Sequence, residues 1–440
     1  MAGRFGKIFE RNFQVMYMIN YSYLRPKKAK ALKNWTEKSF IKRTDIKAYS
    51  YKNATILPLK KFESDNLLFG RGGVVDENGK YIDISAINNR MQNSYEYTSP
   101  LKEDKKVVYC GYLVNQWGHF LVEAVSRMWY FLKNDSSIDN YVFFVSEDEQ
   151  RGLYGNYKEF FELLGVYNKI EIINKPTTFN EVIIPERGYK WREYYSDEYK
   201  NIFDTIAKNI KIDFDLNKYE KIFFTRSQLN KVSETEFGTE MIDNFFEKNG
   251  YKIIAPEKYS LSEMIFYIRN AKICAFVSGS LPHNMLFGND GQELIILERN
   301  IYNNEIQVDV NHIKDLNVTY IDANIGIYPI NLGYGPFIMS YRGMLERFCT
   351  DNNMTPPDEK FYTKQYLKKC FKKYIKCYKR AYCYQWFMED WSVKYTDYLR
   401  EAYLDGLQYF GGYLSGEEPF KISQYFSLHF IKKTIKKLIK

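Results

Sequence analysis

Short apolar runs alternate with segments of helical periodicity through the second half of the chain. The apolar runs predict buried strands at 221–225, 251–254, 272–277 and 293–297. The segments between them predict helices at 234–249, 260–270 and 281–288. This alternation predicts a Rossmann-like sheet, in which ligands bind beyond the carboxyl ends of the strands.

The first half of the chain shows the same alternation less regularly. A hairpin is predicted over 67–85, with its turn at Asp76–Gly79. Further strands are predicted at 107–110, 141–145 and 182–185, and a helix at 118–133. We therefore expect an α/β protein with two Rossmann-like domains. The predicted divisions are a basic N-terminal arm (1–50), an N-terminal α/β domain (51–205), a C-terminal Rossmann-like domain (206–330) and a basic, aromatic, helical C-terminal region (331–440).

The last fifteen residues, 426–440, form an amphipathic helical pattern. Phe430, Ile431 and Ile435 fall on one face, and lysines occupy much of the other. This composition is typical of a helix that lies in an anionic membrane interface. A terminal helix that packs its apolar stripe on the protein is the alternative.

Composition narrows the class of protein. The 440 residues are 45% hydrophobic and carry a net charge of +9, which fits a globular protein with an anionic partner. No run of eighteen apolar residues and no signal peptide is present, so we expect a cytoplasmic location. The six cysteines lack paired spacing, which indicates buried thiols rather than a metal site or disulfides.

One group of candidate catalytic residues lies at the start of the helix predicted at 118–133. His119, Glu123 and Arg127 are spaced four residues apart, which puts them on nearly one helix face, and Asn115 precedes them. A base near neutral pH, a carboxylate and a cation are what activation of an acceptor hydroxyl requires. A structural salt-bridged strip is the alternative.

A second group follows the strand at 272–277. Gly279 and Ser280 come before a short helix that contains His283 and Asn284, and free backbone amides at such a turn attract phosphate. An ordinary tight turn has the same pattern.

A third group follows two other strands. Arg226 and Lys231 offer positive charge for a diphosphate, and Glu298 is placed to accept hydrogen bonds from ribose hydroxyls. Asp213 and Asp215 have the spacing of a metal-binding D-x-D motif, but they lie in a polar linker and are interpreted as a solvated loop.

Together these segments resemble glycosyltransferase family 61 over roughly residues 65–300. The resemblance is carried by Asn115 to Arg127, by Arg226 to Glu234, by Gly279 to Phe287 and by Ile296 to Glu298. The sequence departs from the family pattern at Ser278, where many members have a histidine, and at Leu281 and His283. The resemblance implies a GT-B fold, inversion at the anomeric carbon and independence from metal.

The hypothesis is an inverting glycosyltransferase without a cofactor, which moves a sugar from a nucleotide-sugar to a surface glycan. The acceptor is expected to be a bacterial capsule or cell-wall polysaccharide on a lipid carrier, met at the inner face of the cell membrane. Either His119 or Glu123 is the base, and the residues leave this choice open. The alternative is a non-catalytic glycan-assembly scaffold with a degenerate donor site. Nucleic acid is not an expected partner, since no nucleic-acid-binding module is recognised.

Overall fold

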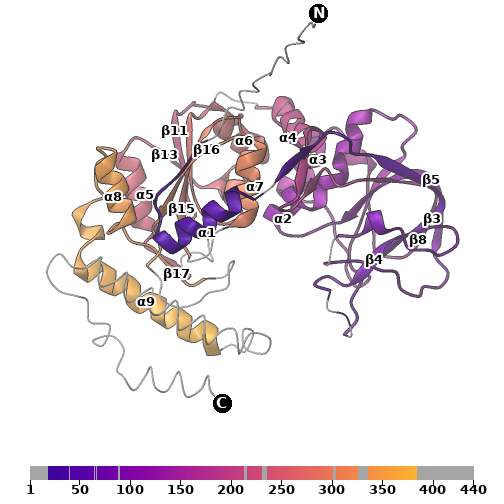
Figure 1. Cartoon of the computed structure of the whole chain (residues 1–440), viewed down its shortest axis with the longest axis horizontal. Coiled ribbons are helices and arrows are strands. Elements are labelled where there is room, and N and C mark those ends of the chain that lie inside the picture. The colour runs from indigo at the N-terminus through magenta and orange to yellow at the C-terminus, as the bar shows by residue number, and fades with distance from the viewer. Residues whose placement is uncertain are drawn as a thin grey trace, which may run out of the picture.

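The fold is built on two six-stranded sheets. The computed structural model describes residues 18–38, 40–63, 65, 67–87, 90–212, 216–229, 235–300, 304–325 and 335–383. One sheet is entirely parallel and the other is mixed, and we call them the parallel sheet and the mixed sheet. Figure 1 shows them as two lobes with helices between them. The predicted α/β class is confirmed.

The parallel sheet has the strand order β1-β16-β15-β14-β11-β13. Its strands are β1 (Ile19–Tyr23), β11 (Lys221–Phe224), β13 (Lys252–Ile254), β14 (Ile273–Val277), β15 (Glu293–Glu298) and β16 (Asn317–Asp322). Its connecting helices are α5 (Thr239–Lys248), α6 (Leu261–Asn270), the 3₁₀ helix η5 (Leu281–Phe287) and α7 (Glu305–Ile313). The four strands predicted in the second half are thus all present, and α6 has the expected capping box between Ser260 and Glu263.

The N-terminal segment belongs to the parallel sheet. β1 pairs with β16, and α1 (Pro26–Thr36) follows it across the carboxyl ends of β15 and β16. Arg25 Nε donates to Asp322 at 2.5 Å, and Lys28 Nζ lies 3.1 Å from a carboxylate oxygen of Glu298. The described part of the predicted basic arm is therefore held by buried acidic groups.

The mixed sheet has the order β4-β3-β8-β5-β6-β7. Its strands are β3 (Ala48–Lys60), β4 (Arg71–Val75), β5 (Leu101–Tyr112), β6 (Asn140–Phe144), β7 (Ile170–Ile173) and β8 (Thr177–Pro185). β5, β6, β7 and β8 are parallel neighbours, whereas β3 is antiparallel to β4 and β8.

The hairpin predicted over 67–85 is only partly correct. The turn at Asp76–Gly79 forms, but the second strand is reduced to a single bridge between Val75 and Tyr81. The chain then enters the 3₁₀ helix η1 (Asp83–Ser85). β4 pairs instead with β3, because the long β3 offers Thr55 to Leu59 as a continuous buried edge.

The helix predicted at 118–133 is also corrected. α2 (Trp117–Val122) ends where Glu123 leaves helical geometry, at φ −116° and ψ −56°. The 3₁₀ helix η2 (Ala124–Lys133) continues from there. A 3₁₀ helix has three residues per turn, so the four-residue spacing in the sequence does not keep side chains on one face beyond Glu123.

A continuous apolar cluster joins the two sheets. It contains Val108 and Phe143 from the mixed sheet together with Phe276 and Ile296 from the parallel sheet. The ring of Phe203 in α4 (Asp197–Asn209) packs edge-on against Phe287 of η5 at 5.3 Å between centroids. Glu159 in α3 (Gly155–Leu163) accepts hydrogen bonds from the first backbone amides of α6. These contacts fix one lobe against the other.

The remaining described elements surround this frame. They are β2 (Ile41–Arg43), η3 (Tyr167–Lys169), β9 (Tyr189–Lys190), β10 (Tyr194–Ser196), β12 (Glu236–Phe237), η4 (Pro256–Lys258), β17 (Phe337–Ile338), α8 (Met344–Asp351), η6 (Glu359–Phe361) and α9 (Lys364–Cys383). The five cysteines whose side chains are described are buried and free, as predicted. Within the described ranges, no helix combines the length and apolar character that crossing a bilayer needs.

A buried carboxylate links α7 to the turn between β9 and β10. Asp309 accepts from the Tyr189 hydroxyl at 2.7 Å and from the Arg192 backbone amide at 3.0 Å. Burial raises the pKa of Asp309 to about 6 although both hydrogen bonds oppose the shift. The folded protein therefore holds this proton more tightly than the unfolded chain does.

We expect Asp309 to make the protein less stable as the pH rises from about 4 to about 6. The free energy of unfolding should fall by about 2–3 kcal/mol across this window, because the unfolded chain loses the proton first. Urea denaturation at a series of pH values measures the slope. Asp309→Asn should flatten it and Asp148→Asn, at an exposed position, should not; equal slopes in the two variants would contradict the assignment.

Candidate active site

The short helix α2 presents a histidine–carboxylate pair. His119 Nδ1 lies 3.1 Å from Glu123 Oε2, and the same oxygen accepts from Arg90 at 3.0 Å. The Glu123 side chain is 8% exposed and that of His119 is 32% exposed. Asn115, just before α2, is exposed. The pair therefore has a shielded acid and a solvent-accessible imidazole.

The electrostatics of the pair distinguish its two members. Burial alone would raise the pKa of Glu123, but the hydrogen bond with His119 and the positive charge of Arg90 outweigh it, and the pKa is lowered. Glu123 is thus an ionised acceptor, so the Nδ1 of His119 carries the proton in their hydrogen bond. In that tautomer the lone pair of His119 is on Nε2.

Arg127 lies away from this pair. Its guanidinium is buried, donates to the carbonyl oxygens of Pro185 and Ile84, and stacks over the Tyr109 ring. Burial lowers the pKa of Arg127 to about 10. A contact between Arg127 and an acceptor would require these bonds to break, so the strip expected from the sequence is reduced to His119 and Glu123.

α2 rests directly on η5, which follows β14 in the parallel sheet. A Cβ atom added to Gly118 would lie 2.6 Å from the Ser280 Cβ and 3.0 Å from the His283 Cδ2. The Trp117 indole donates to the Asn284 side-chain oxygen at 2.9 Å. The first and second groups of predicted residues, distant in the sequence, therefore meet at one helix–helix contact.

His283 is held as a neutral imidazole in this contact. Burial, with a smaller contribution from the nearby His119, lowers its pKa to about 4 although the hydrogen bond with Gln307 opposes the shift. Its Nδ1 lies 2.8 Å from Gln307 Oε1, and the amide of Gln307 donates in turn to Asn311. Asn284 is also occupied, because it accepts from Trp117 and donates to the Leu281 carbonyl. His283 and Asn284, which were both predicted to bind the donor, are therefore hydrogen-bonded to other residues of the protein in this structure.

Two guanidinium groups share one carboxylate at the carboxyl ends of the parallel strands. Arg226 follows β11, Arg299 follows β15, and both bind Glu236 of β12, with Arg226 at 3.0 Å. One carboxylate between two guanidiniums leaves a net positive charge at this edge. Arg299 is 4% exposed, burial lowers its pKa to about 10, and its Nε is buried without a hydrogen-bond partner.

Gly279 has no side chain, which lets the guanidinium of Arg299 lie close to the backbone at this position. Its φ is +145°, and an added Cβ would lie 2.9 Å from an Arg299 guanidinium nitrogen. Ser280 begins η5, which is a 3₁₀ helix of seven residues. Sequence reasoning missed Arg299, although it directly follows a strand, which is the position that identified Arg226.

Glu298 faces a different partner from the one predicted. It is buried, and the Lys28 ammonium of α1 lies 3.1 Å from its carboxylate and donates to the Asn300 carbonyl at 2.7 Å. Burial raises the pKa of Glu298, and Lys28 opposes the shift. A ribose hydroxyl would have to share Glu298 with Lys28. Nothing in the sequence around Lys28 indicates this contact.

Several predicted features lie outside the described residues. They are Lys231, Asp213, Asp215 and the amphipathic segment 426–440. Among the residues that are described, no three His, Cys, Asp or Glu side chains come together as a metal site would require.

The contact between α2 and η5 can be tested through its glycine. Gly118→Ala should destabilise the protein by about 1–3 kcal/mol, because the new methyl group collides with Ser280. Ser280→Gly removes the opposing carbon, so the double variant should recover at least half of the loss. Urea denaturation of the four proteins measures this coupling. Additive effects of the two substitutions would show that the two residues do not meet.

Residues 117–295 match the family model described as Glycosyltransferase 61. The matched segment begins with α2 and ends within β15, so it contains the histidine–carboxylate pair, Arg226 and the Gly279 turn. The match supports a glycosyltransferase activity for this part of the chain. No curated protein matches the chain.

Proposed function

We propose that the chain is an inverting glycosyltransferase that uses a nucleotide-sugar donor and no metal ion. The observation that carries this proposal is the packing of α2 on η5, which brings His119 to the loop edge that also bears Gly279 and the two guanidiniums. A proton acceptor and a concentrated positive charge are the two groups that such a displacement needs.

The donor diphosphate is proposed to bind at Arg226 and Arg299. Guanidinium groups bind phosphate through paired N–H donors, and a partly desolvated site strengthens the attraction. Glu236 orients both side chains before the donor arrives, and it also prevents two unbalanced positive charges at a buried position. Because this charge is supplied by side chains, the proposal gives no role to a divalent cation. The proposal therefore predicts that the activity persists in the presence of a chelator such as EDTA.

His119 is proposed to be the base, and Glu123 the group that orients it. The Glu123 carboxylate holds the Nδ1 proton, which leaves Nε2 to take the proton from an acceptor hydroxyl. The hydroxyl oxygen then forms a bond to the anomeric carbon as the bond from that carbon to the diphosphate breaks. Attack from the side opposite the leaving group inverts the anomeric centre, and Arg226 and Arg299 stabilise the charge on the departing diphosphate.

The acceptor is proposed to be a surface glycan, such as a capsule or cell-wall polysaccharide, presented on a lipid carrier at the cytoplasmic face of the membrane. The two sheets facing one another across α2 and η5 are proposed to form a GT-B-type arrangement. Support for the acceptor side is the accessible His119 beside the exposed Asn115. The non-catalytic scaffold is the alternative that the transfer assay tests, since the predicted donor-binding residues His283 and Asn284 are already hydrogen-bonded to Gln307 and Trp117.

Replacement of the base should abolish transfer and leave donor binding intact. We expect His119→Gln to lower kcat by about 10²–10⁴-fold, the usual contribution of a positioned base, and Glu123→Gln to lower it less. A thermal-shift screen first identifies the stabilising nucleotide-sugar, and turnover is then measured with it. His312→Gln in α7 is the matched control. Turnover near that of the unmodified protein in both site variants would refute the assignment, and absence of turnover with every donor would favour the scaffold.

Removal of either guanidinium should weaken binding of the nucleoside diphosphate. Arg299→Gln and Arg226→Gln should each raise Kd by about 10- to 100-fold, since a hydrogen bond to a charged group contributes about 1.5–3 kcal/mol. Calorimetric titration with UDP, GDP, ADP and CDP measures the effect. Arg269→Gln, which breaks an ion pair with Asp204 on another helix, is the matched control. A diphosphate Kd unchanged in the Arg299 variant would exclude that residue from the site.

A further inference from the structure

The long helix α9 carries a row of exposed lysines on one face. Lys369, Lys372, Lys373 and Lys376 have the spacing i, i+3, i+4, i+7, which places them along a single stripe. We call these four residues the α9 stripe. On a different face, Cys370, Tyr374 and Cys377 are buried against the body of the protein.

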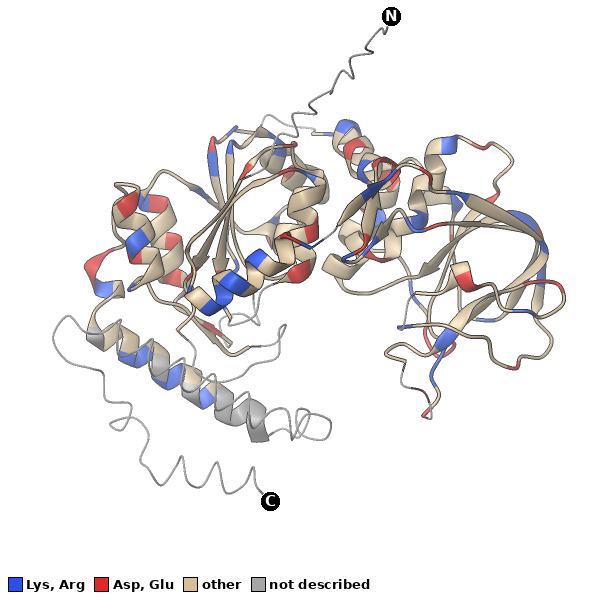
Figure 2. Cartoon of the chain, viewed as in Figure 1, with Lys and Arg blue, Asp and Glu red and all other residues tan. Residues whose placement is uncertain are grey.

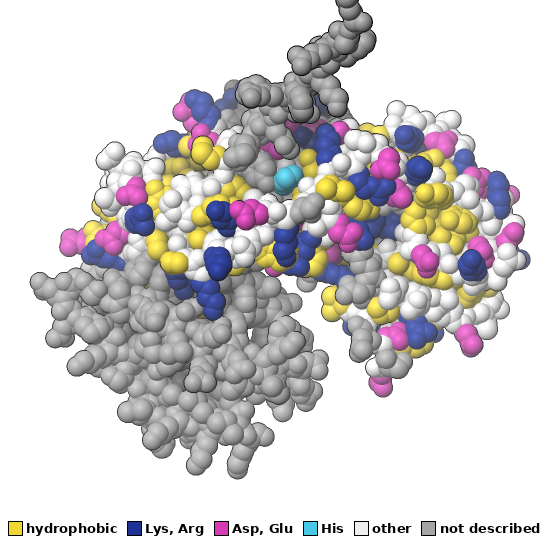
Figure 3. All heavy atoms as spheres, viewed as in Figure 1, with side chains coloured by type: hydrophobic (Ala, Val, Ile, Leu, Met, Phe, Trp, Pro, Cys, Tyr) yellow, Lys and Arg dark blue, Asp and Glu magenta, His cyan; other side chains and the backbone are white. Residues whose placement is uncertain are grey.

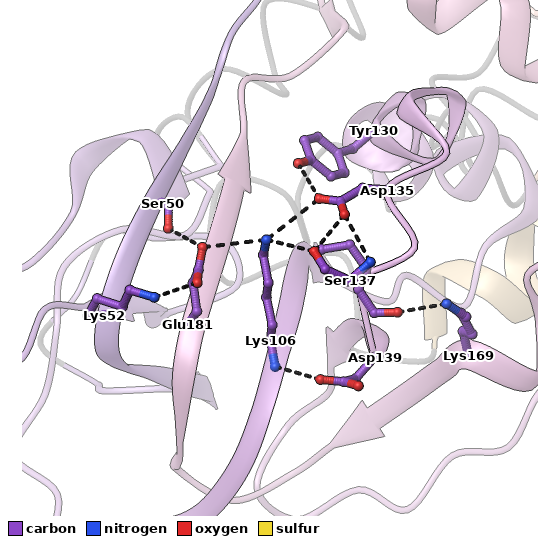
Figure 4. A network of polar contacts seen from close by, with 10 residues as sticks. Ser50, Lys52, Lys106, Tyr130, Asp135, Ser137, Asp139, Lys169 and Glu181 are labelled. Carbon is purple, nitrogen blue, oxygen red and sulfur yellow. Dashed lines mark hydrogen bonds and ion pairs between the residues drawn. The ribbon is translucent and has the colours of Figure 1, made fainter.

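Among the residues that the structure describes, the stripe has no acidic partner. The sequence from 364 to 383 contains no Asp or Glu, and the four lysines form no ion pair with any described residue. Some other surface lysines are paired with carboxylates. Figure 4 shows Lys52 and Lys106 paired with Glu181 of β8, and Lys106 also with Asp135 in the loop before β6.

The described side chains on the face drawn in Figure 3 carry both signs of charge, with basic and acidic groups interspersed over the two lobes. Figure 2 shows Lys and Arg along α9 with no Asp or Glu among them. Within α9, four lysines therefore lie in one row with no acidic residue in the same helix.

The position of α9 relates it to the candidate active site. α9 packs on β12 and β17, and β12 supplies the Glu236 that bridges Arg226 and Arg299. At its N-terminal end, the Tyr366 hydroxyl donates to Glu240 of α5 at 2.8 Å. Figure 1 shows α9 as the outermost helix of its lobe, below β17. The stripe thus lies on the same side of the parallel sheet as the carboxyl ends of its strands.

We propose that the α9 stripe docks the protein on an anionic lipid surface. A row of exposed ammonium groups along one face of a helix suits a flat layer of negative headgroups, and each lysine near such a surface contributes about 1 kcal/mol. Binding of a single-stranded nucleic acid uses aromatic side chains for base stacking, and the stripe itself holds only lysines. The four positions come from a described helix, independent of the segment 426–440.

Docking in this way brings the candidate active site toward the membrane. The β12–β17 pair separates α9 from the two guanidiniums by one layer of structure, so a sugar acceptor on a lipid carrier meets the enzyme from the side on which it is bound. This consequence for the acceptor rests on the proposed function. Attachment of the stripe to lipid does not depend on it.

The test is cosedimentation of the full chain with vesicles. One set of vesicles contains phosphatidylcholine alone and the other an equal mixture of phosphatidylcholine and phosphatidylglycerol. The variant K369Q/K372Q/K373Q/K376Q removes the stripe, and K102Q/K175Q/K218Q/K258Q removes the same charge from exposed lysines elsewhere. A third variant with arginine at the four stripe positions keeps the charge.

We expect the unmodified protein to bind only the anionic vesicles, and less at high salt. The stripe variant should lose about 10³-fold in partition constant, which corresponds to about 1 kcal/mol for each of the four lysines. The control and the arginine variant should stay within about threefold of the unmodified protein. Equal binding by the stripe variant would overturn the proposal, and so would equal binding to neutral vesicles or tighter binding to a DNA or RNA oligonucleotide. Vesicle binding is measured without donor, so a failure of docking and a failure of catalysis are separate results.

Discussion

The close contact of α2 with η5 is the constraint on which the candidate site depends. Only a glycine at position 118 lets the two helices approach so far, and the indole of Trp117 then reaches Asn284. Neither helix is long, and η5 is a 3₁₀ turn. Their alignment therefore comes from tertiary packing, in particular from the aromatic cluster of Phe160, Phe203 and Phe287 behind them.

Buried ion pairs stabilise the other part of the candidate site, at the carboxyl ends of the parallel strands. Glu236 neutralises part of the positive charge of the two guanidiniums. Lys28 neutralises part of the negative charge of Glu298 and Asp322. Each cluster joins residues that are remote in the sequence, which is how the buried charges are compensated. Both clusters lie at the carboxyl ends of the parallel strands, where this class of sheet collects its polar groups.

Hydrophobic periodicity predicted the parallel sheet well, because buried parallel strands are continuous apolar runs and β11, β13, β14 and β15 each have one. It failed where tertiary pairing decides the outcome. β4 pairs with β3 rather than with the segment 81–84, which was its predicted partner. The helix predicted at 118–133 stops being α-helical at Glu123. In the candidate site, rules about strand ends identified Arg226 and Gly279. The contact of Lys28 with Glu298 spans 270 positions of sequence, so local patterns carry no trace of it.

The pairing of β1 with β16 has a consequence for synthesis. The first described strand of the chain lies beside the sixteenth, and the entire mixed sheet is encoded between them. A ribosome releases residues 19–23 long before residues 317–322 exist, so β1 emerges without its neighbour. The mixed sheet has all its strands before the parallel sheet does, and the edge of the latter closes last. Contacts of such long sequence separation slow folding. The segment 19–23 can therefore join the parallel sheet only after residues 317–322 have been made.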